Sequence, residues 1–399
     1  MNKIELLSPA GDLERLDMAL LYGADAVYLA GNQYGMRAAA GNFNYEQMTQ
    51  AVSKAHLLGR KTYITCNTLP RENELAGLPD YLSFLNGIKV DGIICADLGV
   101  IGMCRRYAPD VPLHVSTQLG VVNSETCKML YDLGARTVVL AREVSLKEIA
   151  EIRKNIPDDL RIETFVHGAM CVSFSGRCLL SNYLADRDAN RGQCAQPCRW
   201  RYHLVEENHP GRYFEISEDK GTFILNSNDM CMIEHIPELI DAGVDSLKIE
   251  GRMKSSYYTA VVTQAYRKAI DCAYKNEPVP QAWLNEVDMV SHRPYSTGFY
   301  YGYPGQNYSE SGYTTEADVA AVVESCDALG NAVAVQRNKF LSGDELELLV
   351  PGVLPVCFKA DSITDLDGNP VPDTRHAMMK FLIKLPETAP AGSIIRKRR

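Results

Sequence analysis

The sequence contains no long apolar run. Although 46% of its 399 residues are hydrophobic, no stretch approaches the roughly 18 consecutive apolar residues that a membrane-spanning helix needs. The opening stretch MNKIELLSPAGD carries one lysine and is interrupted by Glu5, so it lacks the apolar centre of a secretory signal peptide. Without a membrane segment or an export signal, a cytoplasmic location is expected.

Positive charge is also in short supply. The chain has 41 Lys and Arg against 50 Asp and Glu, which gives a formal net charge of −9. Because the overall field repels nucleic acid, a site for RNA must be built from a local basic patch. Two stretches qualify: CRWRY at residues 198–202 and RKRR at residues 396–399. The second is either such a patch or a disordered, solubilising tail.

Two signatures of hydrolases are missing. The sequence has no H-E-x-x-H zinc helix and no G-x-S-x-G nucleophile elbow. A cysteine peptidase stays open as an alternative, with Cys171 as the nucleophile beside His167. That arrangement would need a single thiol and would leave the neighbouring cysteines without a role.

Short apolar runs alternate with helix-like patterns along the first two thirds of the chain. Eight runs are strand candidates, at residues 4–10, 25–31, 61–67, 91–97, 112–118, 137–143, 161–168 and 245–252. Strands that are apolar on both faces and separated by helices predict a parallel sheet. Eight such units predict an α/β fold, a (β/α)8 TIM-like barrel over residues 1–280.

The remaining segments depart from this rhythm. Residues 168–244, between the seventh and eighth strands, hold five of the 12 cysteines and predict a cysteine-rich insertion at the catalytic end of the barrel. Residues 281–315 are rich in tyrosine and glycine and predict a linker. Residues 316–399 consist of short β-runs between turns and predict a small all-β barrel domain.

Four cysteines of the insertion form the array C-x6-C-x15-C-x3-C: Cys171, Cys178, Cys194 and Cys198. A reducing compartment argues against disulfides, whereas four converging thiolates can hold zinc or a [4Fe-4S] cluster. Only the last pair has the short spacing of a zinc knuckle, which favours iron–sulfur over zinc or unliganded thiols. Cys231 and His235 could share a metal on one helical turn, but a helix start capped by Asn228 or Asp229, with Cys231 buried, is favoured.

The cysteines of the predicted barrel strands and helices are interpreted as small apolar side chains: Cys66, Cys95, Cys104, Cys127 and Cys272. Cys326 and Cys357 belong to the β-domain. Candidate site residues lie where barrel strands end: Ser8, Asn67, Asp97, Gln118, Arg142, Glu143, His167, Glu250 and Arg252. Each can also be a structural turn or cap residue. His167, four residues before Cys171, is expected to carry a proton near neutral pH or to bond a cluster sulfur.

Several stretches resemble one known family. FVHGAMCVSFSGRCLLSNYL, DANRGQCAQPCRWRY, LNSNDMCMIEHIPEL and GVDSLKIEGRMKSSYY are similar to the collagenase-like peptidases of family U32. The resemblance implies oxygen-independent hydroxylases, whose branches act on tRNA wobble uridines, ribosomal RNA or ubiquinone precursors. It also implies a [4Fe-4S] cluster and, in the RNA branches, prephenate as the hydroxyl donor.

Chain length and the trailing β-domain favour the tRNA branch, so 5-hydroxyuridine is the expected product. A collagenase-like peptidase, a hydroxylase for rRNA or a quinone precursor, and a non-catalytic iron–sulfur scaffold are the alternatives. The resemblance assigns the cluster to Cys171, Cys178, Cys194 and Cys198, with the CRWRY setting favouring Cys198 over Cys231 as fourth ligand.

The remaining roles follow from side-chain chemistry. The catalytic candidates are His167, Glu250, Asn67 and Gln118, and Glu250 is expected to orient Arg252 or a substrate hydroxyl. Prephenate is a dicarboxylate, so its expected site is a pair drawn from Arg142, Arg252 and Arg37.

RNA contacts are expected from Arg199, Trp200, Arg201 and Tyr202. The tyrosines of the linker, Tyr300, Tyr301 and Tyr303, either stack on bases or pack the domains together. The expected partners are therefore tRNA and prephenate, with no membrane, and the sequence identifies no redox partner or paralogue.

Overall fold

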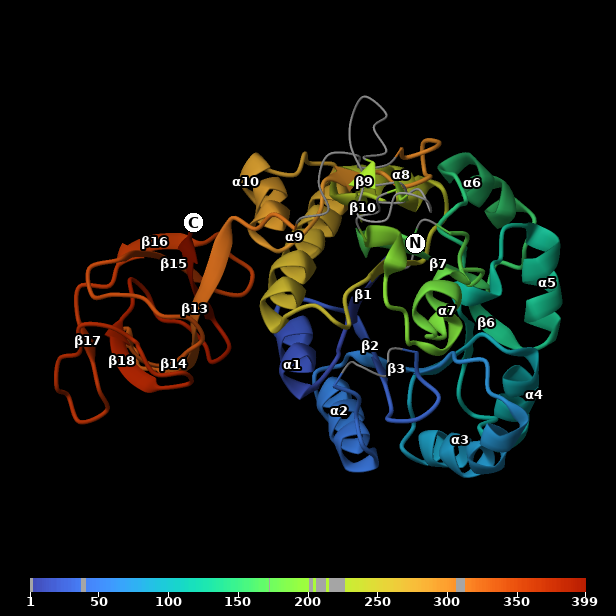
Figure 1. The fold of residues 1–399 in the computed structure, drawn as a ribbon, viewed down its shortest axis with the longest axis horizontal. Helices are drawn as coiled ribbons and strands as arrows, with labels where there is room; N and C mark the ends of the chain where they lie inside the picture. Colours follow the sequence, from blue (N-terminus) through green and yellow to red (C-terminus); the bar gives the residue numbers. More distant parts are fainter. Residues whose placement is uncertain are drawn as a thin grey trace. The chain divides into compact units, whose positions relative to one another are not determined.

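The fold is known from a computed structural model, which Figure 1 shows. It describes residues 3–36, 41–171, 173–200, 204–205, 213–214, 227–305 and 313–399. The chain forms two compact units: residues 1–16, 24–254 and 292–313 make the first, and residues 17–23, 255–291 and 314–399 make the second. The stretch expected to be a linker, 281–315, is divided between the two units. The helix after the eighth barrel strand, expected in the barrel domain, groups with the second unit.

Eight parallel strands form a closed barrel in the first unit (Figure 1): β1 (Glu5–Pro9), β2 (Ala26–Ala30), β3 (Lys61–Cys66), β4 (Gly92–Cys95), β5 (Leu113–Val115), β6 (Ala135–Val139), β7 (Arg161–Ala169) and β11 (Ser246–Ile249). Each strand pairs with the next, and β11 pairs with both β7 and β1, which closes the ring. Every strand falls on a predicted run, so the TIM-like barrel is confirmed.

Helices follow these strands: α1 (Leu13–Leu21), α2 (Tyr45–Leu57), η1 (Glu72–Gly77), α3 (Leu78–Gly87), α4 (Leu98–Tyr107), η2 (Thr117–Leu119), α5 (Ser124–Asp132), α6 (Leu146–Lys154), α8 (Ile236–Asp241) and α9 (Ser256–Lys275). Helices α2 to α6 surround the strands on the outside in Figure 1. Capping boxes begin α2 at Asn44 and α6 at Ser145. These caps fix the loops that join strand ends to helices, where the candidate site residues lie.

The insertion after β7 returns to the barrel sheet. Its elements are α7 (Leu180–Ala185), η3 (Ala189–Arg191), η4 (Pro197–Arg199), β8 (Leu204–Val205), β9 (Tyr213–Phe214), β10 (Asp229–Cys231) and η5 (Ile233–His235). Strand β10 pairs antiparallel with the end of β7, and β12 (Tyr295–Ser296) pairs parallel with β10. Cys231 is therefore in a strand and is half-buried, so the expected helix start with a buried Cys231 is wrong, because this segment pairs with β7.

The second unit contains an antiparallel half-barrel. Its seven strands are β13 (Ala317–Cys326), β14 (Asn331–Gln336), β15 (Glu345–Leu349), β16 (Val356–Lys359), β17 (Ile363–Thr364), β18 (Lys380–Lys384) and β19 (Ile394–Arg398), in the order β16-β15-β19-β13-β14-β18-β17. The unit also contains α9, α10 (Gln281–Leu284) and η6 (Asn285–Met289). The buried face of the sheet, with Phe340 and Phe381 in contact, forms its core. The predicted β-domain is confirmed.

The basic C-terminus is an ordered strand of the half-barrel. Residues 394–398 form the inner strand β19, and Arg396 is fully buried. Its guanidinium binds Glu286 at 2.8 Å and Glu347 at 2.7 Å. Arg398 also binds Glu347, and Arg399 binds Asp318. The expected disordered tail is wrong, because this segment is a strand, and its exposed basic side chains are each paired with an acidic residue of the same unit.

In the described part of the chain, no helix is both long and apolar enough to cross a membrane.

Candidate active site at the carboxyl end of the barrel

Arg142 and Glu250 meet at the carboxyl ends of β6 and β11, the two strands that flank β7 in the barrel. Arg142 follows β6 and Glu250 follows β11, and the ion pair between Arg142 Nη2 and Glu250 Oε2 is 3.2 Å long. The guanidinium of Arg142 lies 4.0 Å from the centre of the Phe165 ring in β7. Glu250, which was expected to orient Arg252 or a substrate hydroxyl, forms an ion pair with Arg142. Arg142 is thus held at the barrel mouth by Glu250 and the Phe165 ring.

Lys254 adds a further cation to this face, and sequence reasoning missed it. Burial lowers the pKa of the Lys254 ammonium; Arg199 and Arg293 lower it further, while Asp229 and Glu250 raise it. These effects place the four side chains within electrostatic range of Lys254. Lys254 lies in a loop after β11, without the strand-end position that marked the other candidates.

Asp229 and Arg293 form a buried ion pair that sequence reasoning also missed. Arg293 donates from Nη2 and Nε to Asp229 Oδ1, at 2.7 and 3.0 Å, and both side chains are almost fully buried. They are 64 residues apart. The pairing depends on β10, a strand that no apolar run in the sequence predicts. The sequence shows only that NSND contains an acidic residue and that SHRPYS contains an arginine.

His167 is buried within the sheet beside this pair. His167 is 1% exposed, and its Nε2 atom lies 3.5 Å from the hydroxyl oxygen of Tyr295. Burial lowers the pKa of His167 to about 3, against the opposing effect of Asp229. The imidazole is therefore neutral at physiological pH. The expectation that it carries a proton near neutrality is not supported by this environment, which favours a neutral hydrogen-bonding group.

The four cysteines of the array lie on the loops and short helices that follow β7. Cys171 and Cys194 are exposed, and Cys178 and Cys198 are half-buried. Burial raises the pKa of the Cys198 thiol, Arg199 lowers it, and Cys171, Cys194 and Cys178 each raise it further. The fold thus brings all four thiols into one neighbourhood. Across the described ranges, no three His, Cys, Asp or Glu side chains are arranged to hold a metal ion.

The loop between the first two thiols is fixed to the barrel by Glu143. The carboxylate of Glu143 accepts hydrogen bonds from Ser175 N at 2.9 Å and from Ser175 Oγ at 3.0 Å. Gly176 then lies directly on Gln118: a Cβ added there would be 2.3 Å from the Gln118 carbonyl oxygen, and its φ is +74°. Glu143 and Gln118, two predicted strand-end residues, therefore position the cysteine loop.

The loop that carries the last two thiols has its own supports. Gln196 N donates to Cys194 Sγ at 3.3 Å, the kind of backbone bond that thiolate ligands accept. The buried Ser181 Oγ accepts from Ala195 N at 2.9 Å and joins this loop to α7. Backbone contacts therefore hold both thiol pairs.

Asn67, Asp97 and Ser8, three further strand-end candidates, make structural contacts. Asn67 accepts from Met36 N at 3.2 Å, Asp97 caps α4, and Ser8 is buried in β1. Arg252 is 5% exposed, and its carbonyl lies against Gly11. Three predicted residues lie outside the described residues: Arg37, Arg201 and Tyr202.

The aromatic side chains expected to contact RNA divide into two groups. Trp200 is 42% exposed, and Tyr301 and Tyr303 are exposed as well. Tyr300 is buried and donates to the Phe165 carbonyl at 2.6 Å, so it packs within the first unit. Arg199, beside Trp200, donates to both Gln196 Oε1 and the Tyr313 hydroxyl at 2.8 Å.

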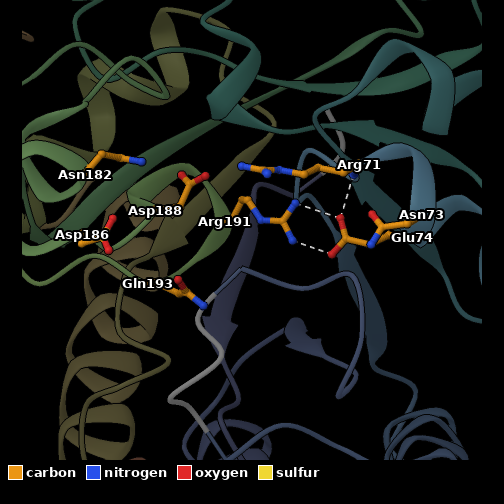
Figure 2. A pocket seen from close by; sticks show the side chains of 8 residues that line it. All are labelled: Arg71, Asn73, Glu74, Asn182, Asp186, Asp188, Arg191 and Gln193. Atoms are coloured by element: carbon orange, nitrogen blue, oxygen red, sulfur yellow. Dashed lines mark hydrogen bonds and ion pairs between the residues drawn. The ribbon is translucent and has the colours of Figure 1, made fainter.

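A polar pocket of about 440 Å³ opens between the cysteine-rich insertion and the loop that follows β3. Figure 2 shows its lining: Arg71, Asn73, Glu74, Asn182, Asp186, Asp188, Arg191 and Gln193. Both Nη atoms of Arg191 donate to the Glu74 carboxylate, and the distance from Nη1 to Oε2 is 2.8 Å. This hydrogen bonding, with a bond from Arg71 N, lowers the pKa of Glu74 to about 2. The pair therefore stays ionised and links the insertion to the barrel.

A closed (β/α)8 barrel, a four-thiol insertion at its carboxyl end and an antiparallel half-barrel together define the class of this protein. Residues 11–310 match the family model of Peptidase family U32, and residues 315–396 match that of the Peptidase family U32 C-terminal domain. The chain belongs to this family.

Three relatives of the chain are described by their names. The chain is 40% identical to tRNA hydroxylation protein P1 of Bacillus subtilis, over 99% of this chain and 95% of that one. It is 38% identical to tRNA hydroxylation protein P of Escherichia coli, over 88% and 87% of the two chains. A 23S rRNA 5-hydroxycytidine C2501 synthase of Escherichia coli is 38% identical over 68% of this chain and 40% of its own length.

Proposed function

We propose that this protein hydroxylates wobble uridine in tRNA to 5-hydroxyuridine without oxygen, with prephenate as the hydroxyl donor and a [4Fe-4S] cluster. One observation carries the proposal: the similarity to proteins named for tRNA hydroxylation extends over both domains and almost the whole chain. The rRNA synthase, in contrast, matches over 40% of its length. Transfer RNA is therefore the preferred substrate class over ribosomal RNA.

Cys171, Cys178, Cys194 and Cys198 would hold the cluster. Cys171, Cys178 and Cys194 lie close enough to Cys198 to raise the pKa of its thiol, and Gln196 N donates to Cys194 Sγ; both observations support this assignment. When bound, an iron–sulfur cluster held by four thiolates would supply a centre that can exchange electrons. The loop contacts of Glu143 and Ser181 would keep the thiols positioned for it.

The cations at the barrel mouth would bind the donor. Prephenate carries two carboxylates, and arginine forks bind carboxylates through paired hydrogen bonds. Arg142 is presented by Glu250 and Phe165, with Lys254 and Arg252 on the same face. The neutral His167 can donate or accept a hydrogen bond there without adding charge. Arg199 and Trp200 would engage phosphate and an unpaired base of the RNA.

The proposal is tested in a strain that lacks this gene and its paralogues. We expect bulk tRNA from that strain to lack 5-hydroxyuridine-type nucleosides, measured by mass spectrometry, and the wild-type gene to restore them. No change in those nucleosides on deletion would contradict the proposal.

The cluster is tested separately by counting iron in anaerobically purified protein. Replacing any of the four proposed ligand cysteines by alanine should remove most of the iron and the absorbance near 400 nm. Cys357→Ala, at an exposed cysteine in the half-barrel, is the matched control and should keep both. Cys231→Ala decides the fourth ligand: iron lost there and kept in Cys198→Ala would overturn the assignment.

A further inference from the structure

The pocket in Figure 2 differs in charge from the proposed prephenate site at the barrel mouth. Its lining carries three carboxylates, from Glu74, Asp186 and Asp188, against two guanidinium groups, from Arg71 and Arg191. An anionic ligand such as a dicarboxylate or a phosphate would meet net negative charge there. The pocket therefore favours a neutral ligand with many hydrogen-bonding groups.

Amide side chains supply the rest of the lining. Asn73, Asn182 and Gln193 each offer an NH2 donor and a carbonyl acceptor. In Figure 2, Asn182 and Asp188 lie on the opposite side of the pocket from Asn73 and Glu74. The Oδ1 atom of Asn182 is buried and has no hydrogen-bond donor among the described residues. A pyrimidine base presents the complementary set, namely carbonyl oxygens and a ring N–H.

The Arg191–Glu74 pair adds a flat surface. Two parallel contacts hold the guanidinium of Arg191 in the plane of the Glu74 carboxylate. RNA-binding proteins stack unpaired bases on guanidinium planes as well as on aromatic rings. Because the pair is preorganised, stacking would require little further ordering of the arginine.

The position of the pocket connects it to the thiols. Gln193 directly precedes Cys194, and Asn182 follows Cys178 by four residues. A volume of about 440 Å³ lies in the range that holds small ligands. We propose that this pocket receives the base and ribose of the target nucleotide, extruded from the RNA, between the amides of Asn182 and Gln193 and the plane of Arg191. This inference rests on the proposed function, because it assigns the place of that substrate.

The test measures binding, so that it does not depend on turnover. Two anticodon stem–loop RNAs are compared with the anaerobically purified full chain, one with uridine at the wobble position and one with an abasic site there. We expect the wild-type protein to bind the uridine RNA at least about fivefold more tightly, since stacking one base on protein is worth roughly 1–3 kcal/mol.

Variants of the lining residues then test whether the pocket causes that preference. Asn182→Ala, Gln193→Ala and Arg191→Lys should each reduce it toward equal affinity while leaving the affinity for the abasic RNA unchanged. Arg191→Lys keeps the charge and removes the plane, which separates stacking from electrostatics. Asn155→Ala, at an exposed amide after α6, is the matched control and should keep the wild-type preference. Iron content and melting temperature confirm that each variant is folded.

The inference and the proposed function fail in different ways. If the wild type restores the modified nucleoside in cells and the folded pocket variants keep its preference for the uridine RNA, the pocket is not the base site. A wild-type protein that hydroxylates but binds both RNAs equally also overturns the inference. Failure of the wild type to restore the nucleoside overturns the proposed function itself.

Discussion

Gly176 shows how much of the site depends on single residues. Its left-handed backbone and its contact with the Gln118 carbonyl leave no room for a side chain. We expect Gly176→Ala to displace the loop between Cys171 and Cys178 and to lower the iron content of the purified protein by at least about half. Gly59→Ala is the matched control, because Gly59 also has a positive φ, of +64°, but no neighbour within 4 Å. Equal iron in both variants would exclude this steric role.

His114 is expected to shape the acid stability of the barrel. It lies buried in β5 with its ring against Tyr63, and burial lowers its pKa from 6.5 to about 3. Between these values the unfolded chain binds a proton that the folded chain does not, so stability falls as the pH falls. The slope for one such group is at most about 1.4 kcal/mol per pH unit, and above pH 6.5 it vanishes.

The measurement is the free energy of unfolding in denaturant at several pH values from 7 to 4. We expect the acid slope to be shallower in His114→Gln than in the wild type, whatever the variant's stability at pH 7. His376→Gln, at an exposed histidine, should keep the wild-type slope. An unchanged slope in His114→Gln would show that this imidazole does not titrate on unfolding.

At the scale of elements, β19 is held by a buried charge cluster in the second unit. Arg396 binds Glu286 in η6 and Glu347 in β15, and it also donates to the Tyr257 hydroxyl at 3.2 Å. Removing the arginine would leave two buried carboxylates without their shared cation. Such a loss costs roughly 3–5 kcal/mol, whereas a surface ion pair is worth about 1 kcal/mol or less.

We therefore expect Arg396→Met to destabilise the second unit by roughly 3–5 kcal/mol, measured as its free energy of unfolding. Arg398→Met is the matched control from the same strand, because Arg398 binds the same Glu347 but its side chain is 60% exposed. It should cost about 1 kcal/mol or less. Similar losses in the two variants would mean that burial of Arg396 is unimportant. Neither variant is expected to weaken tRNA binding, since this basic segment is neutralised.

At the scale of the whole molecule, the sequence predicted what local patterns determine. Eight apolar runs gave the barrel strands, and short alternating runs gave the half-barrel. What it could not predict depends on contacts between distant residues. The pair of Asp229 and Arg293, the partners of Arg396 and the pocket between the β3 loop and the insertion each join segments that carry no mutual signal in a single sequence.

The same reason explains which site residues could be predicted from the sequence and which could not. The four thiols share one short segment, so their spacing alone predicted a centre. The supporting contacts of Glu143, Gln118 and Asn67, three candidates at strand ends, could not be predicted, because only the folded chain shows which backbone atoms they face. Lys254 was missed since a loop lysine has no pattern until its neighbours are known.

The return of β10 to β7 has an evolutionary and a biosynthetic consequence. Ala169 and Asp229 face each other in the sheet, so the cysteine-rich segment leaves and re-enters the barrel at adjacent positions. Such an excursion can be lengthened, shortened or exchanged between relatives while the barrel strands keep their pairing. It would also allow the barrel to form during synthesis and the proposed cluster to be inserted afterwards, so that maturation would be a step separate from folding.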